Sequence, residues 1–107
     1  MIISATSIIG DKVKNSAGEN LGKIEELMVD TANGDVTYAA VSFGGFLGMG
    51  DKLFAVPIEK MRVDTKDECM ILDVPKDRLE NAPGFDKDNW PKDATWFSGV
   101  RDYYTKH

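Results

Sequence analysis

Short apolar segments alternate with clusters of turn-forming residues along most of this chain. The turn clusters lie at 15–20, 31–36, 44–50 and 64–68. The segments between them are rich in β-branched and aromatic residues, which favour strands. They predict strands at 12–15, 22–30, 36–43, 52–58 and 68–74. Closely spaced strands separated by turns are typical of an all-β sandwich or barrel.

Two positions refine this pattern. Asn33-Gly34 is the strongest hairpin signal in the chain, because both residues tolerate the positive φ angles that a tight turn requires. Pro57 has no amide hydrogen to donate, so we expect it at the end or edge of its strand.

The apolar residues within these segments predict one core built from several strands. Because side chains alternate along a strand, some of these residues will lie on the outer face of the sheet. The predicted core residues are Val13, Leu21, Ile24, Leu27, Val36, Tyr38, Val41, Phe43, Phe54, Val56, Ile58, Leu72 and Val74.

The pattern changes at residues 74–84. Pro75 suits the first turn of a helix, Leu79 can face inward, and Ala82-Pro83-Gly84 stops the element. We therefore predict one short helix of one or two turns here.

An aromatic-rich tail follows this helix. Six of the ten Phe, Trp and Tyr residues lie in it: Phe85, Trp90, Trp96, Phe97, Tyr103 and Tyr104. Disordered tails are poor in aromatic residues, so we expect this one to dock through Phe85, Trp90, Trp96 and Phe97. Docking on its own barrel and docking on a neighbouring subunit both stay open.

Composition and charge exclude several functions. The formal net charge of -5 opposes direct nucleic-acid binding, which normally needs a basic face, and docking on anionic lipid. No apolar run approaches the ~18 residues needed to cross a bilayer. The beginning of the chain has no basic region before its apolar residues, so we expect a cytoplasmic protein. Cys69 is the single cysteine, and we interpret it as a small buried apolar residue.

The glycine-rich segment 44–50 does not match a nucleotide-binding loop. The residues after Gly50 are Asp51-Lys52 instead of Lys-Ser/Thr, and a strand follows instead of a helix. A backbone nest for an anion stays open. The apolar tip formed by Phe46, Leu47 and Met49 instead indicates a contact surface.

No residue set resembles an active site. His107 is the single histidine and lies at the end of the chain, where a catalytic role is not expected. Glu25 and Glu26 point to opposite faces of a strand, which argues against a carboxylate dyad with Glu59. Asp86 begins a calcium-like D-x-D spacing, but the loop lacks the required glycine and the final glutamate. We predict a non-enzyme with no cofactor and no metal.

A longer pattern of glycine, apolar and polar positions resembles the PRC-barrel family, named for the photosynthetic reaction centre H subunit. The first part comprises Ile9-Gly10, Val13, Asn15, Gly18-Glu19, Leu21-Gly22 and Ile24. The later parts are "GGFLGMGDKLFAVP" at 44–57 and "ILDV" at 71–74. The resemblance implies a small β-barrel of about six strands. We assign residues 1–80 to this domain and 81–107 to an extension that packs on the barrel or on a partner subunit.

Members of this family serve as adaptors, and stand-alone members are often dimeric. The resemblance therefore implies a non-catalytic protein-interaction module that forms a homodimer and binds an unidentified protein partner. One alternative is an accessory factor of photosynthetic or respiratory electron transfer that docks on a membrane complex. Another is a ribosome-assembly adaptor. This chain has neither the transmembrane helix of the H subunit nor the N-terminal β domain of the ribosome-maturation factor, which argues against those two specific roles.

Overall fold

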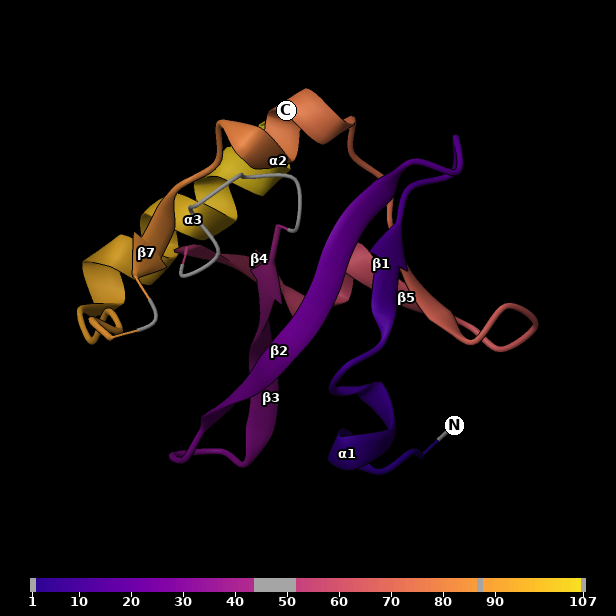
Figure 1. The fold of residues 1–107 in the computed structure, drawn as a ribbon. Helices are drawn as coiled ribbons and strands as arrows, with labels where there is room; N and C mark the ends of the chain where they lie inside the picture. The colour runs from indigo at the N-terminus through magenta and orange to yellow at the C-terminus, as the bar shows by residue number, and fades with distance from the viewer. Residues whose placement is uncertain (1, 44–51, 87, 107) are drawn as a thin grey trace.

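The computed structural model describes residues 2–43, 52–86 and 88–106. Within them lie the strands β1 (Lys12–Lys14), β2 (Asn20–Asp30), β3 (Asp35–Ser42), β4 (Lys52–Pro57), β5 (Met61–Asp64), β6 (Cys69–Leu72) and β7 (Gly84–Asp86). The helices are α1 (Ala5–Ile8), the 3-10 turn η1 (Ile58–Lys60), α2 (Lys76–Glu80) and α3 (Ala94–Lys106). Figure 1 shows α2 and α3 on one side of a curved sheet and α1 at its opposite end.

The strands form one sheet in the order β5-β6-β1-β2-β3-β4-β7. All neighbouring pairs are antiparallel except β1 and β6, which run parallel. β5 and β7 are the two edges, so the sheet curls around its core without closing. The prediction of a mainly β fold is confirmed, with short helices added to the sheet.

All five predicted strands are present, but the sequence pattern did not identify two others. β5 and β7 have four and three residues. Such short segments carry too little alternation to stand out. The predicted short helix is α2. The expectation of only one helix is wrong, because the tail contains the 13-residue α3.

The hairpin predicted at Asn33-Gly34 joins β2 to β3. Gly34 has φ of 78°. The Asp30 carboxylate accepts a hydrogen bond from the Ala32 amide at 2.9 Å, and the Asn33 side-chain oxygen accepts one from the Asp35 amide at 3.1 Å. Pro57 is the last residue of β4, as its missing amide hydrogen predicts.

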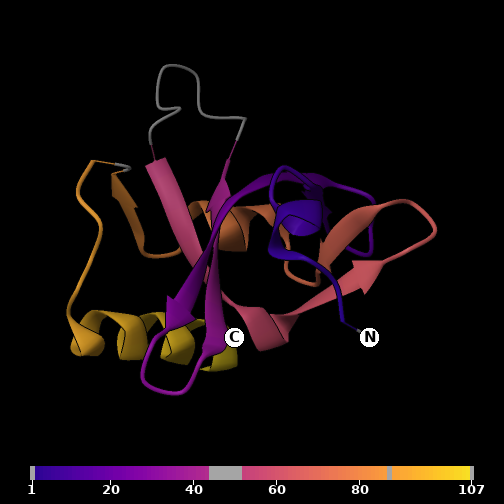
Figure 2. The same ribbon diagram turned by 90° about the horizontal axis from the view of Figure 1, so that it is seen from below.

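Most of the predicted core is confirmed. Nine of its residues are buried: Val13, Leu21, Ile24, Tyr38, Val41, Phe43, Phe54, Val56 and Leu72. Leu27, Ile58 and Val74 are partly buried against them. The prediction for Val36 is wrong, because 36% of it is exposed. Val36 lies near the tip of the β2–β3 hairpin, which projects beyond the rest of the sheet (Figure 2). Cys69 is buried as expected, and this burial raises the pKa of its thiol.

Gly22 lies where β2 passes between β1 and β3. Its φ is +122°, and a Cβ atom there would collide with the carbonyl oxygen of Ser42. Gly18 also has a positive φ, +85°, but a Cβ there would meet open space. Both positions therefore require a backbone conformation that favours glycine, but only Gly22 also has no room for a side chain.

We predict that Gly22→Ala destabilises the fold far more than Gly18→Ala. Gly18→Ala carries only the cost of a left-handed backbone, about 1–2 kcal/mol. Gly22→Ala adds a collision with main-chain atoms that no side-chain rotation relieves. Urea unfolding of both variants measures the difference. Equal losses in the free energy of unfolding would contradict the close approach of β2 and β3.

Candidate interaction site

The C-terminal extension is held in place by a capped helix. The Asp93 carboxylate accepts a hydrogen bond from the Thr95 amide at 2.8 Å, and the Asp93 carbonyl accepts one from the Trp96 amide at 3.1 Å. Asp93 therefore acts as the N-cap of α3. Along the helix, Val100 and Tyr104 are fully or almost fully buried. They attach α3 to the same core as the sheet.

Aromatic rings connect the extension to the sheet in one continuous cluster. The ring of Phe85 on β7 lies 4.9 Å from Trp90 and 5.8 Å from Trp96, measured between centroids. Trp96 lies 5.1 Å from Phe97, and Phe97 lies 4.9 Å from Tyr38 on β3. The four tail residues predicted to dock thus lie together, and they reach the sheet of their own chain.

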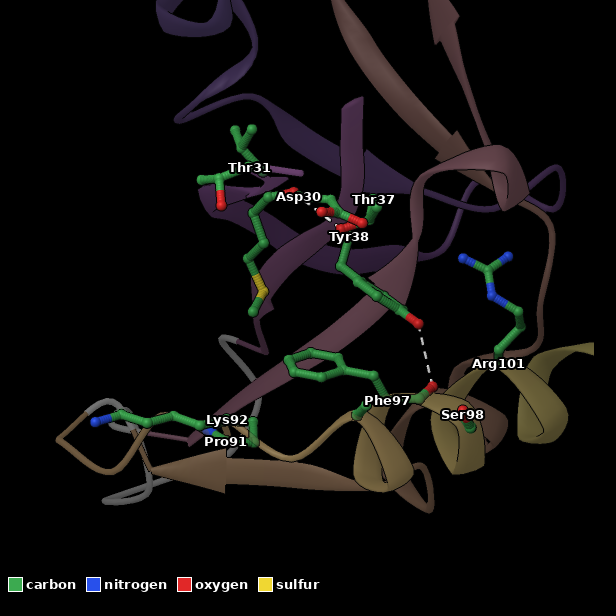
Figure 3. Close-up of a pocket in the computed structure, with 12 residues that line it drawn as sticks. Asp30, Thr31, Thr37, Tyr38, Pro91, Lys92, Phe97, Ser98 and Arg101 are labelled. Atoms are coloured by element: carbon green, nitrogen blue, oxygen red, sulfur yellow. Dashed lines mark hydrogen bonds between the residues drawn. The ribbon is translucent and has the colours of Figure 1, made fainter. Parts of the chain in front are cut away.

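Tyr38 adds a polar contact to this packing. Its hydroxyl donates a hydrogen bond to the main-chain carbonyl of Phe97 at 3.1 Å (Figure 3). The contact joins residues that are 59 positions apart in the sequence. It therefore links α3 to β3 directly.

A second contact joins α3 to α2. The Arg78 guanidinium donates a hydrogen bond to the carbonyl of Tyr103 at 3.0 Å, and the Tyr103 hydroxyl donates one to the carbonyl of Arg78 at 2.6 Å. The guanidinium also lies 4.3 Å from the centre of the Tyr103 ring. These contacts therefore hold α2 and α3 together.

A groove of about 630 Å³ lies between the β2–β3 hairpin and α3. Its volume is within the range of ordinary small-molecule sites. Figure 3 shows Tyr38 and Phe97 between its two walls, with Lys92 at one end and Arg101 at the other. The groove is lined by Met28, Val29, Asp30, Thr31, Thr37, Tyr38, Pro91, Lys92, Ala94, Phe97, Ser98 and Arg101.

The charges around the groove are unevenly arranged. Asp30 belongs to the hairpin wall, whereas Lys92 and Arg101 belong to the wall that the extension forms. Arg101 makes an ion pair with Glu59 of η1 and lies 5.5 Å from the centre of the Tyr38 ring. Lys92 is exposed. Of the charged residues that line the groove, the two cations therefore come from the extension and the one carboxylate from the hairpin, although the chain as a whole is acidic.

The carboxylates considered as catalytic candidates have separate partners. Glu25 accepts a hydrogen bond from the Ser42 hydroxyl at 2.8 Å, whereas Glu59 pairs with Arg101. Asp86 contributes its carbonyl to a turn, where it accepts a hydrogen bond from the Asn89 amide at 2.9 Å. In the described part of the chain, no three His, Cys, Asp or Glu residues come together as a metal site would require.

The predicted interaction residues divide into two groups. Phe46, Leu47 and Met49 lie outside the described residues. Phe85, Trp90, Trp96 and Phe97 form the aromatic cluster, and only Phe97 among them also lines the groove.

Sequence reasoning did not identify the hairpin wall or the basic residues of the extension. A signal for the helix was present: Trp96, Val100, Tyr103 and Tyr104 follow one another at helical spacing. This spacing would have placed Arg101 on a helix. It would not have shown that the helix lies opposite the β2–β3 hairpin, because tertiary packing decides that.

Comparison with known proteins identifies the first three quarters of the chain. The family model for the PRC-barrel domain matches residues 1–79. No curated protein matches the chain. Both β7 and α3 come after the matched segment. None of the helices in the described ranges combines the length and the apolar character that crossing a bilayer demands.

We predict that the same substitution at two adjacent tyrosines has different effects on the free energy of unfolding. Tyr103→Phe removes the hydrogen bond to the Arg78 carbonyl and should cost about 1 kcal/mol of unfolding free energy. The Tyr104 hydroxyl is buried and has no hydrogen-bond partner among the described residues, and burial raises its pKa above the usual range. Tyr104→Phe removes an unsatisfied group, so it should be neutral or stabilising.

Urea unfolding of the two variants beside the unmodified protein checks this contrast. Each variant serves as the control for the other, because both lose one hydroxyl from the same turn of α3. Equal destabilisation by both substitutions, or a larger loss for Tyr104→Phe, would contradict the arrangement of α2 and α3 described above.

Proposed function

The chain belongs to the PRC-barrel family, and from this membership and its surface we propose that it is a non-catalytic protein-interaction module that forms a homodimer. The PRC-barrel domain is an interaction-type domain. The proposal extends this general role to a specific one, self-association of this chain.

The exposed aliphatic pair beside the groove carries the proposal. Val29 and Val36 face each other across the β2–β3 hairpin. Their exposed fractions are 54% for Val29 and 36% for Val36. Contiguous exposed apolar surface beside a groove is a feature of protein contact surfaces. Tyr38 and Phe97 extend the apolar character into the groove itself.

The chemistry of the groove also favours binding over catalysis. General acid–base catalysis needs a positioned proton-transfer group whose pKa lies near the operating pH. The ionisable residues that line the groove are Asp30, Tyr38, Lys92 and Arg101. Three of them already have partners in the chain: Asp30 bonds the Ala32 amide, Tyr38 bonds the Phe97 carbonyl, and Arg101 pairs with Glu59. Aromatic rings flanked by charges suit the docking of another protein surface.

Two further roles stay predictions for the same module: an accessory factor of electron transfer that docks on a membrane complex, and a ribosome-assembly adaptor. Each adds a second protein partner to the homodimer. Residence in the cytoplasm likewise stays a prediction.

Sedimentation velocity over a range of protein concentrations tests the proposed function. We expect a mass that rises from one chain to two as the protein concentration increases, because self-association is favoured by mass action. A mass of one chain throughout would contradict the homodimer, and a mass that continues to rise beyond two chains would indicate aggregation instead.

A further inference from the structure

We propose that the homodimer forms through a reciprocal surface contact. The β2–β3 hairpin of each copy lies against the wall that the extension forms in the other copy. The acidic tip of the hairpin then lies against Lys92, and its aliphatic pair lies against the groove. This inference rests on the proposed homodimer and names the surface that forms it.

The tip of the hairpin contains two adjacent cross-strand pairs of different chemistry. Val29 faces Val36, and Asp30 faces Asp35 at the end of the ladder. All four residues are exposed. Like charges directly opposite each other destabilise a hairpin. A cation supplied by another molecule would offset this repulsion, so the tip has the chemistry of a ligand for a basic, partly apolar surface.

The groove has the complementary chemistry. Lys92 is an exposed cation at one end, and Tyr38 and Phe97 provide an apolar surface between the walls. Figure 3 shows the Lys92 side chain directed away from the two rings. In this orientation its ammonium group is accessible to an approaching carboxylate. Arg101 is already engaged with Glu59, so Lys92 is the better partner for the hairpin tip.

The tip of the β2–β3 hairpin and α3 lie at the same end of the molecule (Figure 2). Val29 and Asp30 themselves belong to the lining of the groove. One continuous patch therefore contains both the acidic, aliphatic element and the basic one. A patch that contains both halves of a contact can pair with its own copy about a two-fold axis, with each contact made twice.

The overall charge of the chain limits which part of its surface can form an interface between two copies. At a formal net charge of -5, two copies repel each other at a distance. An interface between copies must therefore bring opposite charges together locally. The patch does so twice by symmetry, once at each Lys92.

Charge reversal tests the contact between copies. The variants are Asp35→Lys on the hairpin and Lys92→Asp on the extension. Asp35 is chosen over Asp30 because the Asp30 carboxylate holds the turn through the Ala32 amide. The matched controls are Asp67→Lys and Lys66→Asp, which reverse the same charges at exposed positions on the tip of the β5–β6 hairpin.

We expect each single reversal at the patch to raise the dimer dissociation constant about 10-fold or more, because each creates two like-charge contacts. The controls change the net charge equally and should have a much smaller effect. An equimolar mixture of Asp35→Lys and Lys92→Asp should recover the wild-type mass, because the mixed pair has opposite charges at both contacts. Circular dichroism of each variant confirms that the fold is intact.

The outcomes separate this inference from the proposed function. If the wild-type protein forms a dimer but the patch reversals match the controls, or the mixture does not recover the mass, the inference is wrong and the homodimer uses another surface. If the wild-type protein sediments as one chain throughout, both proposals are wrong. Recovery in the mixture supports a contact between copies, since a contact within one chain would not be rescued by mixing.

Discussion

The contact between Tyr38 and Phe97 connects the two parts of the molecule. The rings lie 4.9 Å apart between centroids, and the Tyr38 hydroxyl holds the Phe97 carbonyl at 3.1 Å. An aromatic pair and a hydrogen bond each contribute about 0.5–1.5 kcal/mol. Together they are a substantial part of the ~5–15 kcal/mol by which domains are stable. Together with the burial of Val100 and Tyr104, this contact holds α3 opposite the hairpin, where it forms one wall of the groove.

The extension also completes the sheet. β7 pairs with the first three residues of β4, with Leu53 opposite Phe85, so this half of β4 is not an open edge. Exposed edges invite pairing with other chains, and a short covering strand prevents this. The matched family domain ends at residue 79, before β7 and α3. The same segment thus protects one edge against unspecific pairing and forms a wall of the surface that we propose for specific pairing.

The sequence pattern predicts those elements whose signal is local. The long strands β2 and β3 and their turn at Asn33-Gly34 follow from β-branched residues and turn chemistry that lie within a few positions. Val36 fits the same pattern yet is exposed, because alternation does not show where a hairpin extends beyond its core. The groove could not be predicted, since it depends on the approach of Tyr38 and Phe97, 59 positions apart. Of the predicted interaction residues that the structure describes, only Phe97 lines that groove.

The most direct test of the account is whether the extension and the sheet unfold together. Both tryptophans, Trp90 and Trp96, lie in the extension, so tryptophan fluorescence reports on the extension, whereas far-ultraviolet circular dichroism reports on the strands and helices of the whole chain. Urea unfolding should be followed by both signals on the same samples. If α3 is part of one cooperative unit, the two transitions coincide at one midpoint. A fluorescence transition at clearly lower urea, with the sheet still folded, would contradict the docking of the extension on which the groove and the proposed interface depend.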